Sequence, residues 1–165
     1  MGLGRLLAGG ARPDLEGRLR AHATDERWRV REAVAMALQR LGDDDVPRML
    51  RIVGEWSGRD DPLVLRAAVA GVCEPRLLRT PEATRAALDA CERATGALAA
   101  VPLDARHDPH VRTLRQGLGY CWSVAVAADP EHGLARFEAL SASTDPDVAW
   151  VVQENRRRAR LARLL

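Results

Sequence analysis

Apolar residues recur every three or four positions along most of the chain, which is the spacing of helices that bury one face. Val30, Val34, Leu38 and Leu41 form one such stripe, which ends at Gly42. No stretch alternates apolar and polar residues for long enough to predict a strand. The pattern predicts an all-α chain with helices over residues 13–23, 26–41, 46–57, 62–74, 81–99, 109–128, 130–142 and 146–164.

Four Asp-Pro pairs, with Asp at positions 61, 108, 129 and 145, mark predicted helix starts. Asp at the N-cap accepts a hydrogen bond from a free backbone N–H, and Pro suits the first helical position because no N–H is needed there. Asp25 and the caps at 61, 108 and 145 recur at intervals of 36, 47 and 37 residues. A helical hairpin that repeats at such intervals predicts an α-solenoid.

The segment Asp25–Leu50, DERWRVREAVAMALQRLGDDDVPRML, resembles a HEAT repeat. An Asp precedes its first helix, Val-Arg stands in the first turn, and an Asp-rich turn with Val-Pro opens the second helix. Residues 61–100 and 108–142 match more loosely, and 145–165 resemble the closing half repeat of small bacterial HEAT-like proteins. The longest interval contains AAVPLDARH (99–107) and departs from the usual spacing.

The resemblance implies one HEAT-like repeat domain over residues 13–165, preceded by a flexible N-terminus at 1–12. It implies a right-handed α-solenoid of about three full repeats with a terminal helix at each end. In general, HEAT-like proteins are scaffolds and adaptors, so it also implies a non-catalytic module that binds other proteins.

Composition agrees with a single soluble domain of 165 residues, 47% of them hydrophobic and 29% charged. We expect a cytoplasmic protein without a membrane contact, because no apolar run is long enough for a signal peptide or a membrane span. All 25 basic residues are Arg, and residues 150–165 hold five of them against a single Glu. The chain therefore ends in a basic segment.

Few residues suggest chemistry. Cys121 lies in LGYCWSVAVAADP (118–130), on the same apolar stripe as Leu118 and Ala125, so we interpret it as a core residue and not a nucleophile. His107, Asp108 and His110 offer too few ligands for a divalent metal, because Asp108 is already used as a cap. The three Cys residues show no zinc or disulfide spacing. We therefore predict no catalytic residue, no metal and no cofactor.

Trp28, Trp56 and Trp150 are predicted at one edge of the repeats. They form either an interaction strip, as Trp does at binding hot spots, or packing between Ala-rich helices, and packing is the favoured interpretation. Asn155 falls on the apolar stripe of the last helix. Its amide must find a hydrogen-bond partner there, and a carbonyl of the preceding helix is the simplest candidate.

The second helix of each hairpin, over residues 45–57, 81–99 and 130–142, is expected to line a concave surface. Its mixed charges suit an unidentified protein or peptide of matched charge. Charge reversal at Arg48 and Arg85 is expected to weaken that binding without changing the melting temperature. The candidate partner-binding residues are Arg48, Arg51, Glu55, Trp56, Arg85, Asp89, Glu92 and Arg136.

A nucleic-acid-binding or DNA-repair protein is the alternative, because bacterial alkylpurine DNA glycosylases are also built from HEAT-like repeats. That resemblance carries over no catalytic residue, and the charges expected on the concave surface nearly cancel. A third hypothesis is a HEAT-like bilin lyase, for which no motif is present. The alternative basic surface comprises Arg156, Arg157, Arg158, Arg160 and Arg163.

Overall fold

The computed structural model describes residues 13–165, and every regular element in that range is a helix, which confirms the all-α prediction. The predicted flexible N-terminus, residues 1–12, lies outside the described residues. The elements are α2 (Pro13–Ala23), α3 (Trp28–Asp44), α4 (Val46–Trp56), α5 (Pro62–Val72), α6 (Pro81–Ala100), η1 (Leu103–Ala105), α7 (Pro109–Ala128), α8 (Pro130–Ala139), η2 (Leu140–Ala142), α9 (Pro146–Arg156) and α10 (Ala159–Ala162).

The Asp-Pro pairs start helices as the sequence predicts. The carboxylate of Asp61 accepts from the backbone N–H of Leu63 at 2.8 Å, and that of Asp108 accepts from His110 at 2.7 Å. Asp129 and Asp145 cap α8 and α9 in the same way. Asp25, which has no Pro after it, does not cap a helix. Helix α3 begins at Trp28 and not at residue 26, because the side chain of Arg27 binds the Asp25 carboxylate.

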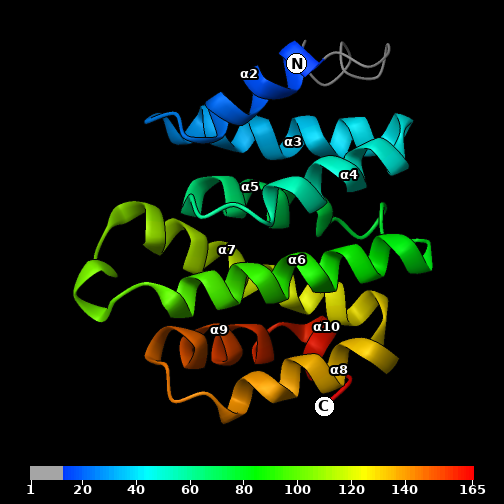
Figure 1. Cartoon of the computed structure of the whole chain (residues 1–165). Coiled ribbons are helices and arrows are strands. Elements are labelled where there is room, and N and C mark those ends of the chain that lie inside the picture. The colour runs from blue at the N-terminus through cyan, green and yellow to red at the C-terminus, as the bar shows by residue number, and fades with distance from the viewer. Residues whose placement is uncertain (1–12) are drawn as a thin grey trace.

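The helices lie in two layers. Helices α3, α5, α7 and α9 pack side by side in chain order and form the first layer. Helices α4 and α6 pack against α5 from its other side, and α8 packs against α7. Figure 1 shows the order of the helices from α2 at one end to α8, α9 and α10 at the other. The core between the layers includes Leu38, Leu65, Trp122 and Phe137, each at most 1% exposed.

Close contact within the first layer depends on glycine. A Cβ at Gly71 of α5 would lie 2.9 Å from the Leu38 Cβ of α3, closer than side chains tolerate. A Cβ at Gly119 of α7 would lie 2.9 Å from the ring of Trp150 on α9. The absence of a side chain therefore lets each helix approach its neighbour in this layer.

The C-terminal segment corrects one prediction. The helix expected over residues 146–164 ends at Arg156, and a separate turn of helix, α10, follows Arg158, whose backbone is extended. The break directs α10 back onto α7 and α9 and buries Leu161 completely. We attribute the break to this burial, because an apolar side chain removed from water contributes about 1.5–3 kcal/mol.

Candidate functional site

The charges predicted to bind a partner on α4 and α8 pair with residues of neighbouring helices. Glu16 of α2 accepts from Arg48 at 3.0 Å and from Arg51 at 2.7 Å. These ion pairs hold α2 against α4, so they connect helices of this chain. The remaining pairs of this set are Glu55 with Arg20 at 3.3 Å and with Arg59 at 2.8 Å, and Arg136 with Asp89 at 2.6 Å and with Glu92 at 3.3 Å.

Arg85 differs from the rest of that set, because it is exposed and makes no side-chain hydrogen bond or ion pair to any described residue. Arg48 is the opposite case, with a side chain only 10% exposed. The expectation from the sequence that both could be reversed without loss of stability therefore fits Arg85, whereas the largely buried ion pair of Arg48 argues against it.

Arg48→Glu is expected to lower the free energy of unfolding by about 2–4 kcal/mol, because it places a carboxylate against Glu16 in a largely buried pair. Arg85→Glu is expected to change it by less than about 0.5 kcal/mol, as surface substitutions usually do. Thermal unfolding followed by circular dichroism measures both. Equal melting temperatures for the two variants would contradict the structural role of Arg48.

The tryptophans do not form a shared interaction edge. Trp56 is 2% exposed and lies in the core, which removes it as a partner-binding anchor and corrects that prediction. Its place on the apolar stripe of α4 with Met49 and Val53 explains the burial. Trp150 packs on Gly119 and under the guanidinium of Arg115, 4.5 Å from its ring centroid. Of these residues only Trp28 is exposed, at 64%.

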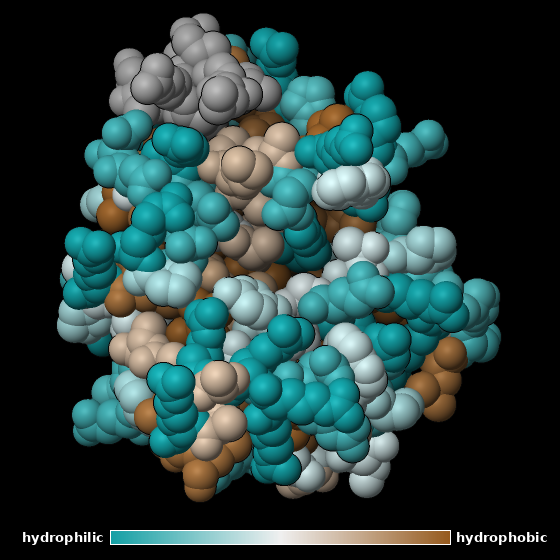
Figure 2. Space-filling view, turned by 180° about the vertical axis from the view of Figure 1, so that it is seen from behind, coloured by the Kyte–Doolittle hydropathy of each residue, from teal (hydrophilic) through white to brown (hydrophobic). Residues whose placement is uncertain are grey.

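The first layer carries a hollow of about 350 Å³ that its helices α3, α5 and α7 line together. Figure 2, the view from behind, shows an apolar recess bordered by hydrophilic side chains on this side of the molecule. The polar lining includes Glu32 and Gln39 from α3, Arg66 from α5 with Glu74 just after its end, and Gln116 and Tyr120 from α7. This surface combines an apolar floor with hydrogen-bonding walls.

Exposed apolar side chains lie on two of the helices that line this hollow, α3 and α7. Trp28, Glu32 and Met36 are spaced four residues apart and therefore share one face of α3. Glu32 lines the hollow, and Met36 is 53% exposed. Tyr120, on the lining from α7, is 40% exposed. Half of the large apolar or aromatic side chains that are exposed in the described chain thus lie on α3 and α7.

The charged groups of the hollow are partly neutralised. Arg66 pairs with Glu32, and a second nitrogen of Arg66 donates to the backbone oxygen of Arg31 at 3.5 Å. Gln39 donates to the backbone oxygen of Ala70 at 3.0 Å, which ties α3 to α5. Glu74 pairs with Arg76 at 3.1 Å. The hollow therefore has no strong field of one sign.

The three thiols converge below the hollow. The Sγ atoms of Cys73 and Cys91 are 3.6 Å apart, and Cys73 and Cys121 both border the hollow. Contact with Cys73 and burial raise the pKa of the Cys121 thiol well above its ordinary value, and burial raises the pKa of Cys91. These thiols are therefore protonated at neutral pH and weakly nucleophilic. The interpretation of Cys121 as a core residue is confirmed by its 3% exposure.

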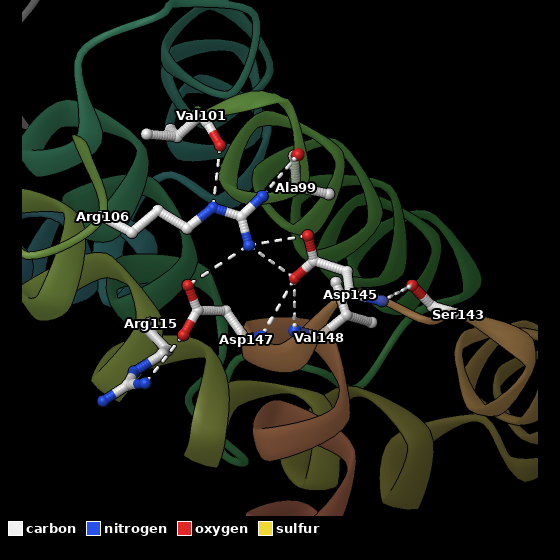
Figure 3. A network of polar contacts seen from close by, with 8 residues as sticks. All are labelled: Ala99, Val101, Arg106, Arg115, Ser143, Asp145, Asp147 and Val148. Atoms are coloured by element: carbon white, nitrogen blue, oxygen red, sulfur yellow. Dashed lines mark hydrogen bonds and ion pairs between the residues drawn. The ribbon is translucent and has the colours of Figure 1, made fainter. Parts of the chain in front are cut away.

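A buried cation occupies the irregular connection between α6 and α7. The Arg106 side chain is 9% exposed and donates to the backbone oxygens of Val101 and Ala99, each at 2.8 Å. It also reaches Asp145 at 2.6 Å and Asp147 at 3.4 Å, at the start of α9 (Figure 3). These contacts join the end of α6 to the start of α9. We therefore assign this cluster a structural role.

The basic surface predicted at the C-terminus is divided by the break before α10. Arg156 donates to Ser141 at 3.0 Å, and Arg157 pairs with Glu154 at 2.6 Å. Arg158 and Arg160 instead turn toward α7 and stack on the ring of Tyr120. Arg163 is exposed and, within residues 13–165, has no side-chain partner. The five arginines therefore do not surround a single helix.

The hollow was missed from the sequence, although a signal for it exists. Met36 is an apolar residue that lies off the buried stripe of its helix, and Gln116 and Tyr120 lie off the stripe formed by Leu114 and Leu118. Side chains that lie off the buried stripe are exposed, and a cluster of apolar residues among them indicates a binding surface. Their gathering across three helices depends on how the helices pack, which the local pattern does not contain.

Comparison of the chain with models of known protein families gives no match, and comparisons with curated proteins and with solved structures give none either. Within residues 13–165, no helix is both long and apolar enough to cross a membrane. No group of three or more His, Cys, Asp or Glu in the same range is arranged to hold a metal ion. A functional proposal therefore depends on the geometry of the surface itself.

Proposed function

We propose that this chain is a HEAT-like repeat module that binds a segment of another protein in the hollow on α3, α5 and α7. The observation that carries the proposal is a hollow of about 350 Å³ whose helices α3 and α7 also carry three exposed apolar or aromatic side chains, Trp28, Met36 and Tyr120. Exposed apolar groups with a polar border are typical of protein interaction sites, and aromatic residues are enriched at their energetic centres.

The same surface supports binding without catalysis. None of the residues that line the hollow is a histidine, and the two cysteines among them are buried and protonated. Glu32 forms an ion pair with Arg66, and Glu74 forms one with Arg76. Catalysis needs an acid, base or nucleophile placed free to act on a substrate. A surface that offers hydrogen bonds and apolar contact suits recognition of a peptide segment.

Two features support the HEAT-like arrangement within this proposal. The first helices of the hairpins pack in chain order, and Asp61, Asp108 and Asp145 cap them in the same manner. The second helices then occupy the other layer, as they do in a solenoid. Because two thiols lie 3.6 Å apart without a disulfide, we expect the module to work in a reducing compartment such as the cytoplasm.

Met36→Glu tests the site, because a new charge at this exposed position, one turn from Glu32 on the same face of α3, should prevent docking while the fold tolerates it. We expect the tagged wild-type protein to retain a discrete protein from a lysate of its native cells, and Met36→Glu to retain less than a tenth as much. Arg85→Glu, on α6 in the other layer, is the matched control and should retain as much as the wild type.

The two variants also separate the alternatives. Loss of retention with Arg85→Glu but not with Met36→Glu would move the site to α4, α6 and α8, where the sequence had suggested it. Retention that disappears after nuclease treatment would favour the nucleic-acid alternative and contradict the proposal. Equal melting temperatures of wild type and Met36→Glu would show that lost retention is not lost folding.

A further inference from the structure

Two arginines are fixed on an aromatic ring at the border of the hollow. The guanidinium carbons of Arg158 and Arg160 lie 5.6 and 5.1 Å from the ring centroid of Tyr120. Arg160 also donates a hydrogen bond to the Tyr120 hydroxyl at 3.0 Å. Tyr120 itself lines the hollow. Both cations are therefore held beside the space in which a bound segment would lie.

The positive charge of this pair is not balanced within the described chain. Arg160 meets no carboxylate, and its hydrogen bond goes to a neutral phenol. Arg158 has a single carboxylate neighbour, Glu154, at 4.0 Å. Glu154 is already bound to Arg157 at 2.6 Å. By contrast, Arg106 and Arg136 each reach a carboxylate at 2.6 Å.

Stacking on Tyr120 prepares these arginines to bind an anion. A cation over an aromatic face loses part of its freedom before any ligand arrives. The planar guanidinium fork matches a carboxylate with two parallel hydrogen bonds. Leu161 of α10 is fully buried. It anchors α10 and therefore keeps both cations at the border. A preorganised site of this kind loses less entropy on binding than a mobile one.

We infer that the segment bound in the hollow is acidic, and that Arg158 and Arg160 bind one of its carboxylates beside Tyr120. This inference rests on the function proposed above and specifies the partner: a protein segment that combines apolar side chains for the hollow with Asp or Glu at the end next to α10. Arg163, exposed and without a partner in the described chain, adds to the attraction.

A protein carboxylate fits this surface better than a nucleic acid does. A phosphate backbone needs a continuous basic track, because it carries a charge at every nucleotide. Here the same hollow is also lined by Glu32 and Glu74, which would oppose a polyanion lying along it. The two guanidinium groups that contact Tyr120 also cover part of the ring on which a base would stack. One localised carboxylate meets none of these obstacles.

Fluorescence anisotropy with three labelled probes tests the inference. The probes are a 14-residue peptide with Leu at helical spacing and a single Glu at one end, its twin with that Glu replaced by Gln, and a 14-nucleotide strand of thymidine, all at about 0.1 M salt. The proteins are the wild type, Met36→Glu, the double variant Arg158→Gln/Arg160→Gln, and the control Arg18→Gln/Arg85→Gln. The control removes two exposed arginines that lack side-chain partners in the described chain, so net charge is matched.

We expect the acidic peptide to bind the wild type and the control alike, and to bind Arg158→Gln/Arg160→Gln at least tenfold more weakly. The Gln twin should bind the wild type as weakly as the acidic peptide binds that variant. Equal binding of both peptides, equal loss in the control, or no binding of the acidic peptide would overturn the inference. Tighter binding of the thymidine strand would also overturn it, in favour of nucleic acid.

The outcomes for the two proposals are distinguishable. If both peptides bind the wild type equally and Met36→Glu abolishes binding of both, the hollow binds protein segments and the acidic preference is wrong. If Met36→Glu leaves retention of the native protein intact, the proposed site fails, whatever the peptides show.

Discussion

Arg106→Met is expected to lower the free energy of unfolding by about 3–5 kcal/mol, the cost of removing one partner from a buried charged network. Arg106 satisfies the backbone oxygens of Ala99 and Val101 and neutralises Asp145 and Asp147, whose side chains are 16% and 12% exposed. Without the guanidinium, these two carboxylates would remain close together at the start of α9 with less compensation. Met has nearly the same length, so lost packing contributes little.

Urea unfolding measured by circular dichroism at pH 7 determines the effect. Arg112→Met is the matched control, because Arg112 lies on α7, is exposed and has no side-chain partner among residues 13–165. It should change stability by less than about 0.5 kcal/mol. A difference of less than about 1 kcal/mol between the two variants would contradict the role assigned to the Arg106 cluster.

Acid provides an independent readout of the same cluster. Burial opposes ionisation of Asp145, but hydrogen bonds from Arg106 and from the backbone N–H groups of Val148 and Asp147 outweigh it, so its pKa lies below the ordinary value. A carboxyl with a lowered pKa in the folded state stabilises the fold above its unfolded pKa, and this contribution is lost as pH falls. The difference between wild type and Arg106→Met should therefore narrow below about pH 4.

The helix starts were predictable from the sequence because they depend on neighbouring residues. Asp and Pro in succession determine a cap within three residues of the chain, and Asp61, Asp108, Asp129 and Asp145 all act as predicted. The apolar stripe of residues 109–128 was predictable for the same reason, since it depends on local spacing, and it correctly placed Cys121 and Trp122 in the core.

The charged contacts were not predictable, because they join residues far apart in the chain. Arg136 and Asp89 are separated by 47 residues, and Arg48 and Glu16 by 32. No local spacing distinguishes an arginine that pairs with the next helix from one that faces a partner, as the contrast between Arg48 and Arg85 shows. The sequence therefore indicated a charged surface on α4, α6 and α8 where the folded chain uses most of the charge internally.

The hollow was hidden for a related reason. Tyr120 lies next to Cys121 and Trp122 in a segment that reads as core, yet it points out of α7 at 40% exposure. The helix breaks at Arg157 and Arg158, and the apolar pattern of the last predicted helix does not reveal this break. Only the packing of α10 against α7 brings Arg158 and Arg160 to the ring of Tyr120.

Asn155 is the second residue whose substitution is expected to lower the free energy of unfolding strongly, and the sequence already predicted that its side chain has a partner. The sequence required a partner for its amide, and the structure confirms a carbonyl of another helix. With 0% exposure, its nitrogen donates to the backbone oxygens of Leu118 at 2.8 Å and Val151 at 2.7 Å. Its oxygen accepts from the backbone N–H of Ser123 at 2.8 Å. This one amide therefore connects α9 to the middle of α7.

Asn155→Leu is expected to lower the free energy of unfolding by about 2–4 kcal/mol, because an apolar side chain of similar size makes no hydrogen bond to the buried N–H and the buried carbonyl that Asn155 contacts. Asn155→Asp should cost more at pH 7, since its carboxylate would face two backbone oxygens without water. Such a buried acid has a raised pKa, so it destabilises the fold above its unfolded pKa, and the penalty shrinks as pH falls.

Urea unfolding at pH 7 and pH 4 should therefore rank wild type, Asn155→Leu and Asn155→Asp in falling order at pH 7 and bring Asn155→Asp closer to wild type at pH 4. Gln153→Leu and Gln153→Asp are the controls, because Gln153 is an exposed residue of the same helix without a side-chain partner in the described chain. If Asn155→Asp is no less stable than Gln153→Asp at pH 7, the amide does not hold α9 to α7. Acid is expected to bring both Arg106→Met and Asn155→Asp closer to wild type, but for different reasons: the wild type loses the Arg106 contribution at the start of α9, whereas Asn155→Asp is relieved of a buried charge near the end of that helix.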